Sequence, residues 1–167
     1  MLVNLSSFAA SDRTLTPEKS KSLLDFCHSC GASLFRVNFL CVKGEESERL
    51  MNAFYERVAG FAAGDKVLEG IESSGFKRQP SWFLNDSSME LILRETGGDL
   101  FAYNILYLPE DWLLYRDDTI FLQIVSHEQE ATLRLSAAEY EKFRLLGIPH
   151  SLDPAKWTGL PEQPIRE

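Results

Sequence analysis

The pattern with the clearest chemical meaning is Cys27-His28-Ser29-Cys30. A redox-active pair with this spacing sits at the start of a helix, where the helix dipole lowers the pKa of the thiol. Here the pair falls at the end of a predicted helix, with both cysteines on its apolar stripe. A zinc site would also need two further ligands at a suitable spacing. We therefore interpret both residues as reduced, metal-free core cysteines, ahead of a metal or a redox role.

Other segments contain residues of known catalytic or ligand-binding motifs, but each lacks a required partner. The segment His127-Glu128-Gln129-Glu130 has no second histidine, which a zinc-protease helix needs. The segment 60–64 has two glycines but no Lys-Ser/Thr after them, which a phosphate-binding loop needs. Adjacent acids such as Glu110 and Asp111 suit acid–base chemistry in principle, but turn acids are more often only solvated. These patterns predict no metal, no cofactor and no catalytic residue.

The net charge of −8 is concentrated in one part of the chain. Residues 85–130 contain ten acidic and two basic residues, whereas the segments before and after them each contain equal numbers of both. Such a concentration can steer a partner of opposite charge to a surface. It also repels nucleic acid, and basic patches interleaved with aromatic residues are missing from the sequence. We therefore predict no direct nucleic-acid binding.

The hydrophobic pattern predicts how these acids are positioned. From Phe76 onward its period changes from that of a helix to the two-residue period of β-strands. Short turns between successive strands are typical of an antiparallel meander. The predicted strands of this meander cover residues 76–84, 89–95, 99–108, 112–116, 119–127 and 131–136. The apolar segment 34–42 is predicted to form a further, central strand.

Capping signals indicate where the helices begin. Thr16-Pro17-Glu18 combines an N-cap, a first-position proline and a first-turn acid, and Ser136 and Glu139 form a capping box. Helices are predicted over residues 17–30, 45–63 and 137–146, with a short one carrying Val67, Leu68 and Ile71. Residues 1–15 are predicted to be irregular.

Together these elements predict one α+β domain over residues 1–147, an antiparallel β-meander of about five to seven strands packed with three to four helices. It comprises a neutral helical part (16–75), an acidic meander (76–136) and a closing helix (137–147), followed by an extended C-terminal tail (148–167). The sequence shows no signal-peptide pattern, no apolar run that could span a membrane and three cysteines. We therefore expect a soluble, cytoplasmic protein.

The meander predicts where the acids gather, because successive turns alternate between the two ends of the sheet. One end is predicted to collect Asp86, Glu110, Asp111, Glu128 and Glu130 beside His127, and the other to collect Glu95, Asp99, Asp117 and Asp118. With the exception of Glu95, these residues are the candidate partner-binding site. We favour the first end, which gathers more acids and a histidine. The alternative is a solvated acidic rim that serves only solubility.

These features favour a non-enzymatic binding protein that engages a basic protein partner through an acidic surface. Toxin-neutralising immunity proteins and inhibitors share this general character. Aromatic side chains that face outward would anchor such a partner, and the candidates are Trp82, Trp112, Tyr103, Tyr107 and Tyr115. At alternating positions in strands, each of them is expected in the core ahead of an interface. Two alternatives stay open: a small enzyme or small-molecule-binding domain with an unrecognised pocket between sheet and helices, and a structural subunit that homodimerises. Convergent His, Asp and Arg side chains in a closed cleft would favour the enzyme.

Overall fold

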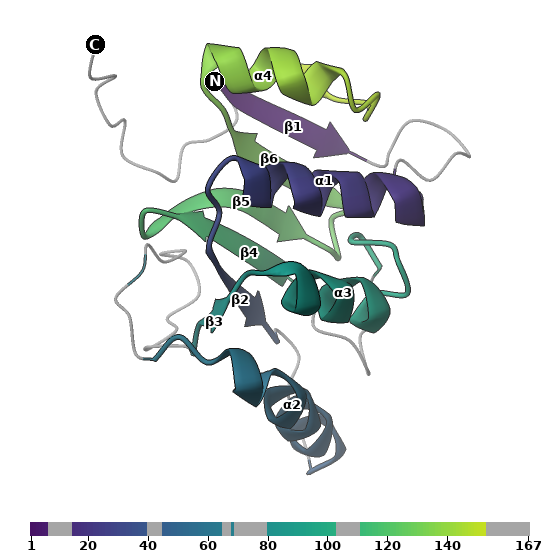
Figure 1. Cartoon of the computed structure of the whole chain (residues 1–167). Coiled ribbons are helices and arrows are strands. Elements are labelled where there is room, and N and C mark those ends of the chain that lie inside the picture. The colour runs from purple at the N-terminus through teal and green to yellow at the C-terminus, as the bar shows by residue number, and fades with distance from the viewer. Residues whose placement is uncertain (7–14, 40–44, 65–67, 69–79, 103–110, 153–167) are drawn as a thin grey trace.

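The computed structural model describes residues 1–6, 15–39, 45–64, 68, 80–102 and 111–152 of the chain (Figure 1). In this described part, a seven-stranded antiparallel sheet combines with four α-helices. The predicted α+β fold class is therefore confirmed.

The sheet has the strand order β3-β2-β4-β5-β6-β1-β7. Its strands are β1 (Leu2–Ser6), β2 (Leu34–Asn38), β3 (Trp82–Phe83), β4 (Asp111–Arg116), β5 (Thr119–Val125), β6 (Glu130–Arg134) and β7 (Ser151–Leu152). Within the described residues, the consecutive meander consists of β4, β5 and β6. The sheet is completed by strands that are distant in sequence, because β2 pairs with β4 and β1 pairs with β6.

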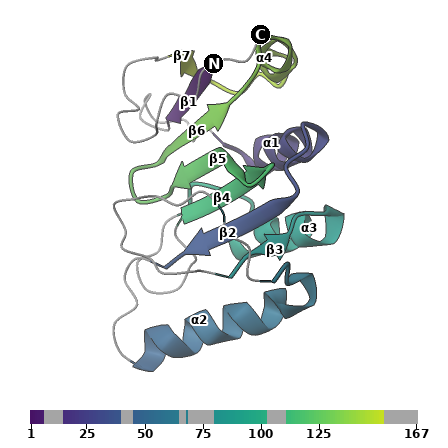
Figure 2. The ribbon, with the colours of Figure 1, turned by 90° about the vertical axis from the view of Figure 1, so that its left-hand side faces the viewer.

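The helices are α1 (Pro17–Ser29), α2 (Glu45–Val58), α3 (Asp86–Glu95) and α4 (Ala137–Arg144), and one turn of 3-10 helix (Ala59–Phe61) follows α2. Figures 1 and 2 show α1, α3 and α4 along one face of the sheet, with α2 beyond its β3 edge. The Thr16 side chain caps α1 and the Ser136 side chain caps α4, as predicted. None of the described helices combines the length and the apolar character needed to cross a membrane.

The prediction of a strand over residues 89–95 is wrong, because this segment belongs to α3. The Asn85 side chain accepts a hydrogen bond from the Ser88 backbone N–H, and the Ser88 hydroxyl receives one from the Asn85 N–H in return. This capping box starts a helix directly after β3. The buried positions 88, 89, 92 and 96 follow the three- and four-residue steps of a helix. The alternation at Met89, Leu91 and Leu93 was too short to distinguish the two periods.

Several other predicted elements differ from the observed ones. Residues 2–6 were predicted to be irregular but form β1, and the predicted tail contributes β7, which pairs with β1. Residues 99–102 form turns rather than a strand, since the Asp99 and Ala102 N–H groups donate to Thr96 and Asp99 carbonyls. Segment 76–84 contributes only β3 within its described residues. Residues 103–108 and most of the short helix near Leu68 lie outside the described part.

The two faces of the sheet pack differently. On the helical face, strand side chains such as Phe35 and Leu133 join residues of all four helices in the main hydrophobic core. That core includes residues from Val3 to Ile148, so both ends of the described chain contribute to it. The opposite face carries a smaller apolar cluster of Leu34, Leu68, Leu113, Tyr115 and Ile120.

Arg116, at the end of β4, connects three elements of the fold. Its Nη1 donates to the Cys30 carbonyl at 3.1 Å and to Glu139 Oε1 at 2.5 Å. Its guanidinium also lies 4.3 Å from the centroid of the Phe121 ring. Partial burial acts to raise the pKa of the Glu139 carboxyl, but hydrogen bonds from Ser136 and Arg116 outweigh it and hold that pKa below its ordinary value. The pair thereby fixes the start of α4 against the end of α1.

Replacing Glu139 with glutamine should therefore lower the free energy of unfolding at neutral pH by about 1–3 kcal/mol. Because the folded-state pKa is depressed, this stabilisation is complete above the ordinary value of 4.5 and is lost as the pH falls below it. Urea unfolding at about pH 7 and about pH 3 should show that Glu139→Gln reduces the difference in stability between the two conditions. Glu141→Gln, at an exposed position of the same helix, is the control. An unchanged pH dependence in Glu139→Gln would contradict the role of this pair.

Candidate functional site

The structure separates the predicted acidic residues into several groups. Of the first predicted end, Asp111, His127, Glu128 and Glu130 come together where β4 begins, β5 ends and β6 begins. We call these four residues the acidic hairpin end. Asp86 does not join them, because it lies in the first turn of α3, and Glu110 lies outside the described residues. Of the second predicted end, Asp117 and Asp118 stay together, whereas Asp99 lies in the turn after α3.

Asp86 and Asp99 lie away from their predicted ends of the sheet, because α3 forms where a strand over residues 89–95 was predicted. The pKa of Lys21 in α1 is raised by a hydrogen bond from its ammonium to Asp25 and, to a smaller extent, by the nearby carboxylates of Asp86 and Glu90. Asp99 Oδ1 accepts a hydrogen bond from the Phe101 N–H at 3.0 Å, which shapes the turn after α3. Asp86 and Asp99 are therefore placed by α3 and its connections, and not by the turns of a meander.

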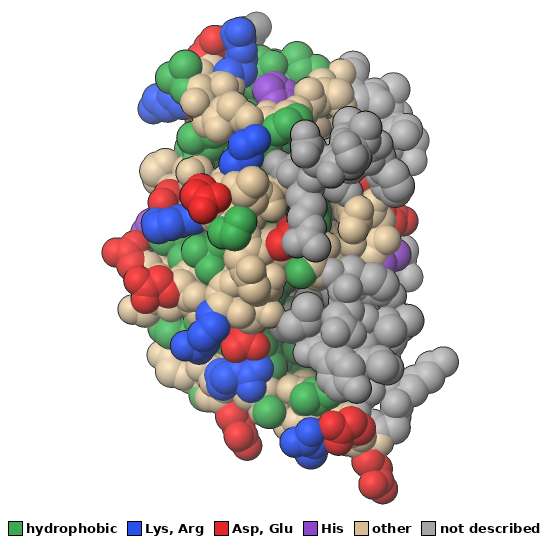
Figure 3. Space-filling view, turned by 90° about the vertical axis from the view of Figure 1, so that its right-hand side faces the viewer, with side chains coloured by type: hydrophobic (Ala, Val, Ile, Leu, Met, Phe, Trp, Pro, Cys, Tyr) green, Lys and Arg blue, Asp and Glu red, His purple; other side chains and the backbone are tan. Residues whose placement is uncertain are grey.

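The acids of the 85–130 segment also have cationic neighbours from other parts of the chain. Glu95 accepts two hydrogen bonds from the Arg57 guanidinium, at 2.9 and 2.7 Å. On the face shown in Figure 3, Lys and Arg side chains lie among the Asp and Glu side chains of the described residues. The acidic stretch of the sequence is thus distributed over separate parts of the fold. The acidic hairpin end is the group that retains the predicted gathering of acids and histidine.

The geometry of the acidic hairpin end centres on His127. Its Nδ1 lies 3.9 Å from Asp111 Oδ1, and its Nε2 lies 3.8 Å from Glu128 Oε1. The Glu128 side chain is 59% exposed and that of His127 is 39% exposed, whereas Asp111 is buried. Glu130, the first residue of β6, is exposed as well. The site therefore exposes the carboxylates of Glu128 and Glu130 and the imidazole of His127 to solvent, whereas the Asp111 carboxylate is buried.

Backbone contacts hold the turn that carries these side chains. Val125 and Glu130 are paired in the sheet, so the loop between them has four residues. The Glu128 N–H donates to the Val125 carbonyl at 3.2 Å, and the Gln129 N–H donates to the Ser126 carbonyl at 3.1 Å. Gln129 takes a φ of 53°, the left-handed conformation that closes many hairpin loops. Asp111 Oδ1 then accepts the N–H of fully buried Ser126 at 3.1 Å, which ties the turn to the start of β4.

Replacing Asp111 with alanine is expected to lower the free energy of unfolding by about 1–3 kcal/mol. The substitution removes the acceptor of the buried Ser126 N–H, and a buried donor without an acceptor retains the cost of leaving water. Urea unfolding followed by circular dichroism measures the change. Glu128→Ala is the matched control in the same turn, and its effect should stay within about 0.5 kcal/mol because the side chain is solvated. Equal effects of the two substitutions would contradict the bracing role of Asp111.

Ser126, His127 and Asp111 are residue types of nucleophilic catalysis, but their arrangement does not suit that chemistry. The contact from Ser126 to Asp111 uses the backbone N–H of the serine, and Ser126 is fully buried. The 3.9 Å separation of His127 Nδ1 and Asp111 Oδ1 exceeds hydrogen-bond distance. An activated serine would instead lie in a cleft that solvent and substrate can reach. In the described contacts, Asp111 and Ser126 hold the turn that carries His127.

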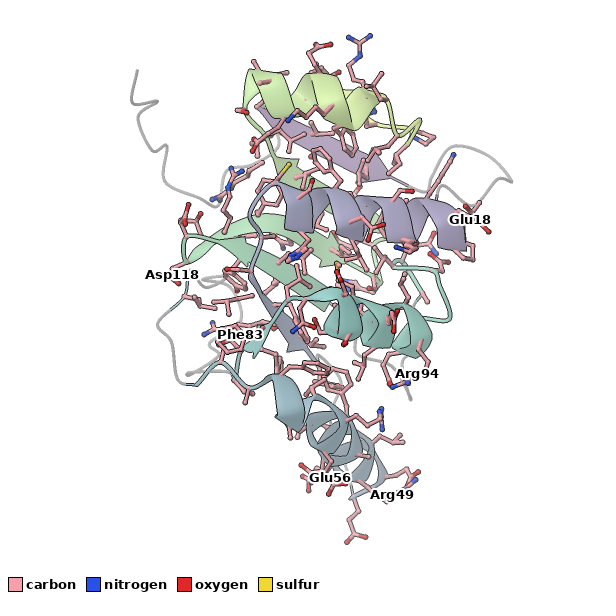
Figure 4. The ribbon with its side chains drawn as sticks, viewed as in Figure 1. Glu18, Arg49, Glu56, Phe83, Arg94 and Asp118 are labelled. Atoms are coloured by element: carbon pink, nitrogen blue, oxygen red, sulfur yellow. The ribbon has the colours of Figure 1, made fainter. Side chains whose placement is uncertain are left out.

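Asp117 and Asp118 form the β4–β5 turn at the opposite end of the sheet (Figure 4). Their φ angles are 50° and 62°, in the left-handed region. Aspartate enters this region more readily than most residues, and two consecutive positions of this kind make the tight turn that suits twisted strands. These two aspartates therefore suit the backbone conformation of the β4–β5 turn.

The two described cysteines are free and lie near the end of α1. Burial of Cys27 is complete, and it raises the pKa of this thiol well above the ordinary value. Cys30 is half-buried against the main core, and the pKa of its thiol is raised by burial and then by Glu139. The predicted burial is confirmed for Cys27 and is partial for Cys30. Across the described ranges, no group of three or more His, Cys, Asp or Glu side chains could hold a metal ion.

In the native protein, Cys27 should react with a thiol reagent at least about tenfold more slowly than Cys30. The reagent reaches Cys27 only when the structure opens, whereas part of Cys30 faces solvent. Timed labelling followed by mass spectrometry of proteolytic fragments measures both rates. In urea the two rates should become similar, which controls for intrinsic reactivity. Rapid, equal labelling of both thiols in the native state would contradict the buried position of Cys27.

Sequence reasoning missed a polar row on the sheet face opposite the helices. Cross-strand register aligns Arg36, Leu113, Gln123, Thr132 and Asn4. The buried Arg36 guanidinium lies 5.6 Å from the centroid of the Tyr115 ring, and the Thr132 hydroxyl donates to Asn4 Oδ1 at 3.3 Å. The available signal was the spacing of Arg36 and Asn38, since polar residues two apart in a strand share one face. The apolar character of segment 34–42 obscured it.

Comparisons of the chain with protein-family models, with curated proteins and with solved structures gave no match.

Proposed function

We propose that this protein is a non-enzymatic binding protein whose acidic hairpin end engages a basic protein partner. The partner would carry a patch of lysine and arginine side chains, as a nucleic-acid-binding protein or a toxin does. The protein would then resemble a toxin-neutralising immunity protein or an inhibitor in its general mode of action. It would act in the cytoplasm.

One observation carries this proposal: exposed Glu128 and Glu130 lie with His127 on a hairpin turn that the buried Asp111 braces. A braced turn keeps its carboxylates in place before a partner arrives, so less conformational entropy is lost on binding. Carboxylates gathered at one end of a sheet also produce a local negative potential. Such a potential raises the rate at which a cationic surface meets the site.

The positions of the aromatic side chains indicate how much they contribute to binding of the basic partner. Three of the candidate anchors are buried in the described structure, which confirms the expected core position and leaves them no part in an interface: Trp82, Trp112 and Tyr115. Tyr103 and Tyr107 lie outside the described residues. Binding through the acidic hairpin end should therefore depend mainly on charge and less on buried aromatic surface. A charge-dominated interface is fast to form and sensitive to salt.

The experiment that tests this function is affinity capture from the native host with three baits. The first bait is the unmodified protein, and the second carries Glu128→Lys and Glu130→Lys. The third carries Glu48→Lys and Glu56→Lys at exposed positions of α2, and therefore has the same net charge as the second. Retained proteins are identified by mass spectrometry, and the binding of each is then measured with purified components.

The proposal predicts a basic protein that the first and third baits retain and the second bait loses. It is overturned if every protein retained by the first bait is retained equally by the second. It is also overturned if the second and third baits lose the partner equally, because net charge and not the acidic hairpin end would then explain retention.

A further inference from the structure

We draw no further inference here: the strongest candidate, the exposed apolar side chain of Leu152 on the edge strand β7, is an unpartnered apolar position, and nothing in the described part of the structure shows what covers it.

Discussion

Replacing Phe54 with alanine is expected to lower the free energy of unfolding by about 3–5 kcal/mol. Phe54 anchors α2 in the core and is 1% exposed. Its ring centroid lies 6.0 Å from those of Trp82 and Trp112, in edge-to-face arrangements, and 5.5 Å from that of Phe39. Alanine would remove these contacts and leave a cavity among rigid rings, which relax poorly around a void.

The effect should be large because Phe54 is one of the buried side chains in the final turns of α2 that join this helix to the main core. Val58 is buried beside Phe54, and Arg57 both pairs with Glu95 and lies 5.9 Å from the Phe54 ring. Urea unfolding of Phe54→Ala measures the loss. Glu56→Ala, at an exposed position of the same helix (Figure 4), should change the stability by no more than about 0.5 kcal/mol. A loss below about 1 kcal/mol in Phe54→Ala would contradict the assigned role of Phe54 in anchoring α2.

Reversing Glu128 and Glu130 to lysine is expected to slow association with the basic partner at least about tenfold at low ionic strength. The two substitutions change the charge of the acidic hairpin end by four units and turn attraction into repulsion. The fold should survive, because both side chains are exposed and surface changes usually alter stability by less than about 0.5 kcal/mol each. Stopped-flow or surface-based kinetics with the purified partner measures the association rate.

The matched control is the double reversal of Glu48 and Glu56 on α2, which changes the net charge equally. Reversals at Asp117 and Asp118 are less suitable, because lysine would enter the left-handed conformation of the turn at a cost in stability. Asp99 is also unsuitable, since its carboxylate accepts the Phe101 N–H. An association rate that falls equally in the two double variants would contradict a localised site.

Local signals predicted much of this fold. The turns between β4, β5 and β6 are two and four residues long, and such connections permit little besides an antiparallel hairpin. Side-chain caps at Thr16 and Ser136 likewise begin helices where the sequence indicated. Such features depend on neighbours within a few residues, which a single sequence displays directly.

The elements that were missed depend on distant parts of the chain. β1 is a strand because β6 offers it a partner more than a hundred residues later. The central strand β2 was predicted, but its pairing with β3 and β4 depends on equally distant parts of the chain. Within a short window, the helical period of α3 and the period of a strand both fit its apolar residues. The decisive local feature is Asn85, which caps α3 and lies in the segment between the two strands predicted at 76–84 and 89–95.

In the candidate site, too, positions set by neighbouring strands were predicted, whereas positions that depend on other parts of the fold were not. Asp111 was correctly predicted to lie at the same end of the sheet as the turn that carries His127 and Glu128, because the hairpin strands β4 and β5 lead away from that end and back to it. Asp86 and Asp99 were misplaced because their predicted position assumed that residues 89–95 form a strand. The burial of Asp111 could not be predicted from its residue type. Its carboxylate is buried where it accepts the N–H of Ser126, which lies across the hairpin.

The salt dependence of the association rate between the captured partner and the unmodified protein shows whether the acidic hairpin end steers a basic protein to the site. Between about 0.01 M and about 0.15 M ionic strength, the screening length falls from about 30 Å to about 8 Å. If the acidic hairpin end steers a basic partner, the unmodified protein and the α2 control variant should both associate at least about tenfold more slowly at the higher salt. The Glu128→Lys, Glu130→Lys variant should lose this dependence or show the opposite one, because salt would then screen a repulsion. Rates that are equal at both salt concentrations, and unchanged by the reversal, would contradict steering by the acidic hairpin end and leave these acids a role in solubility alone.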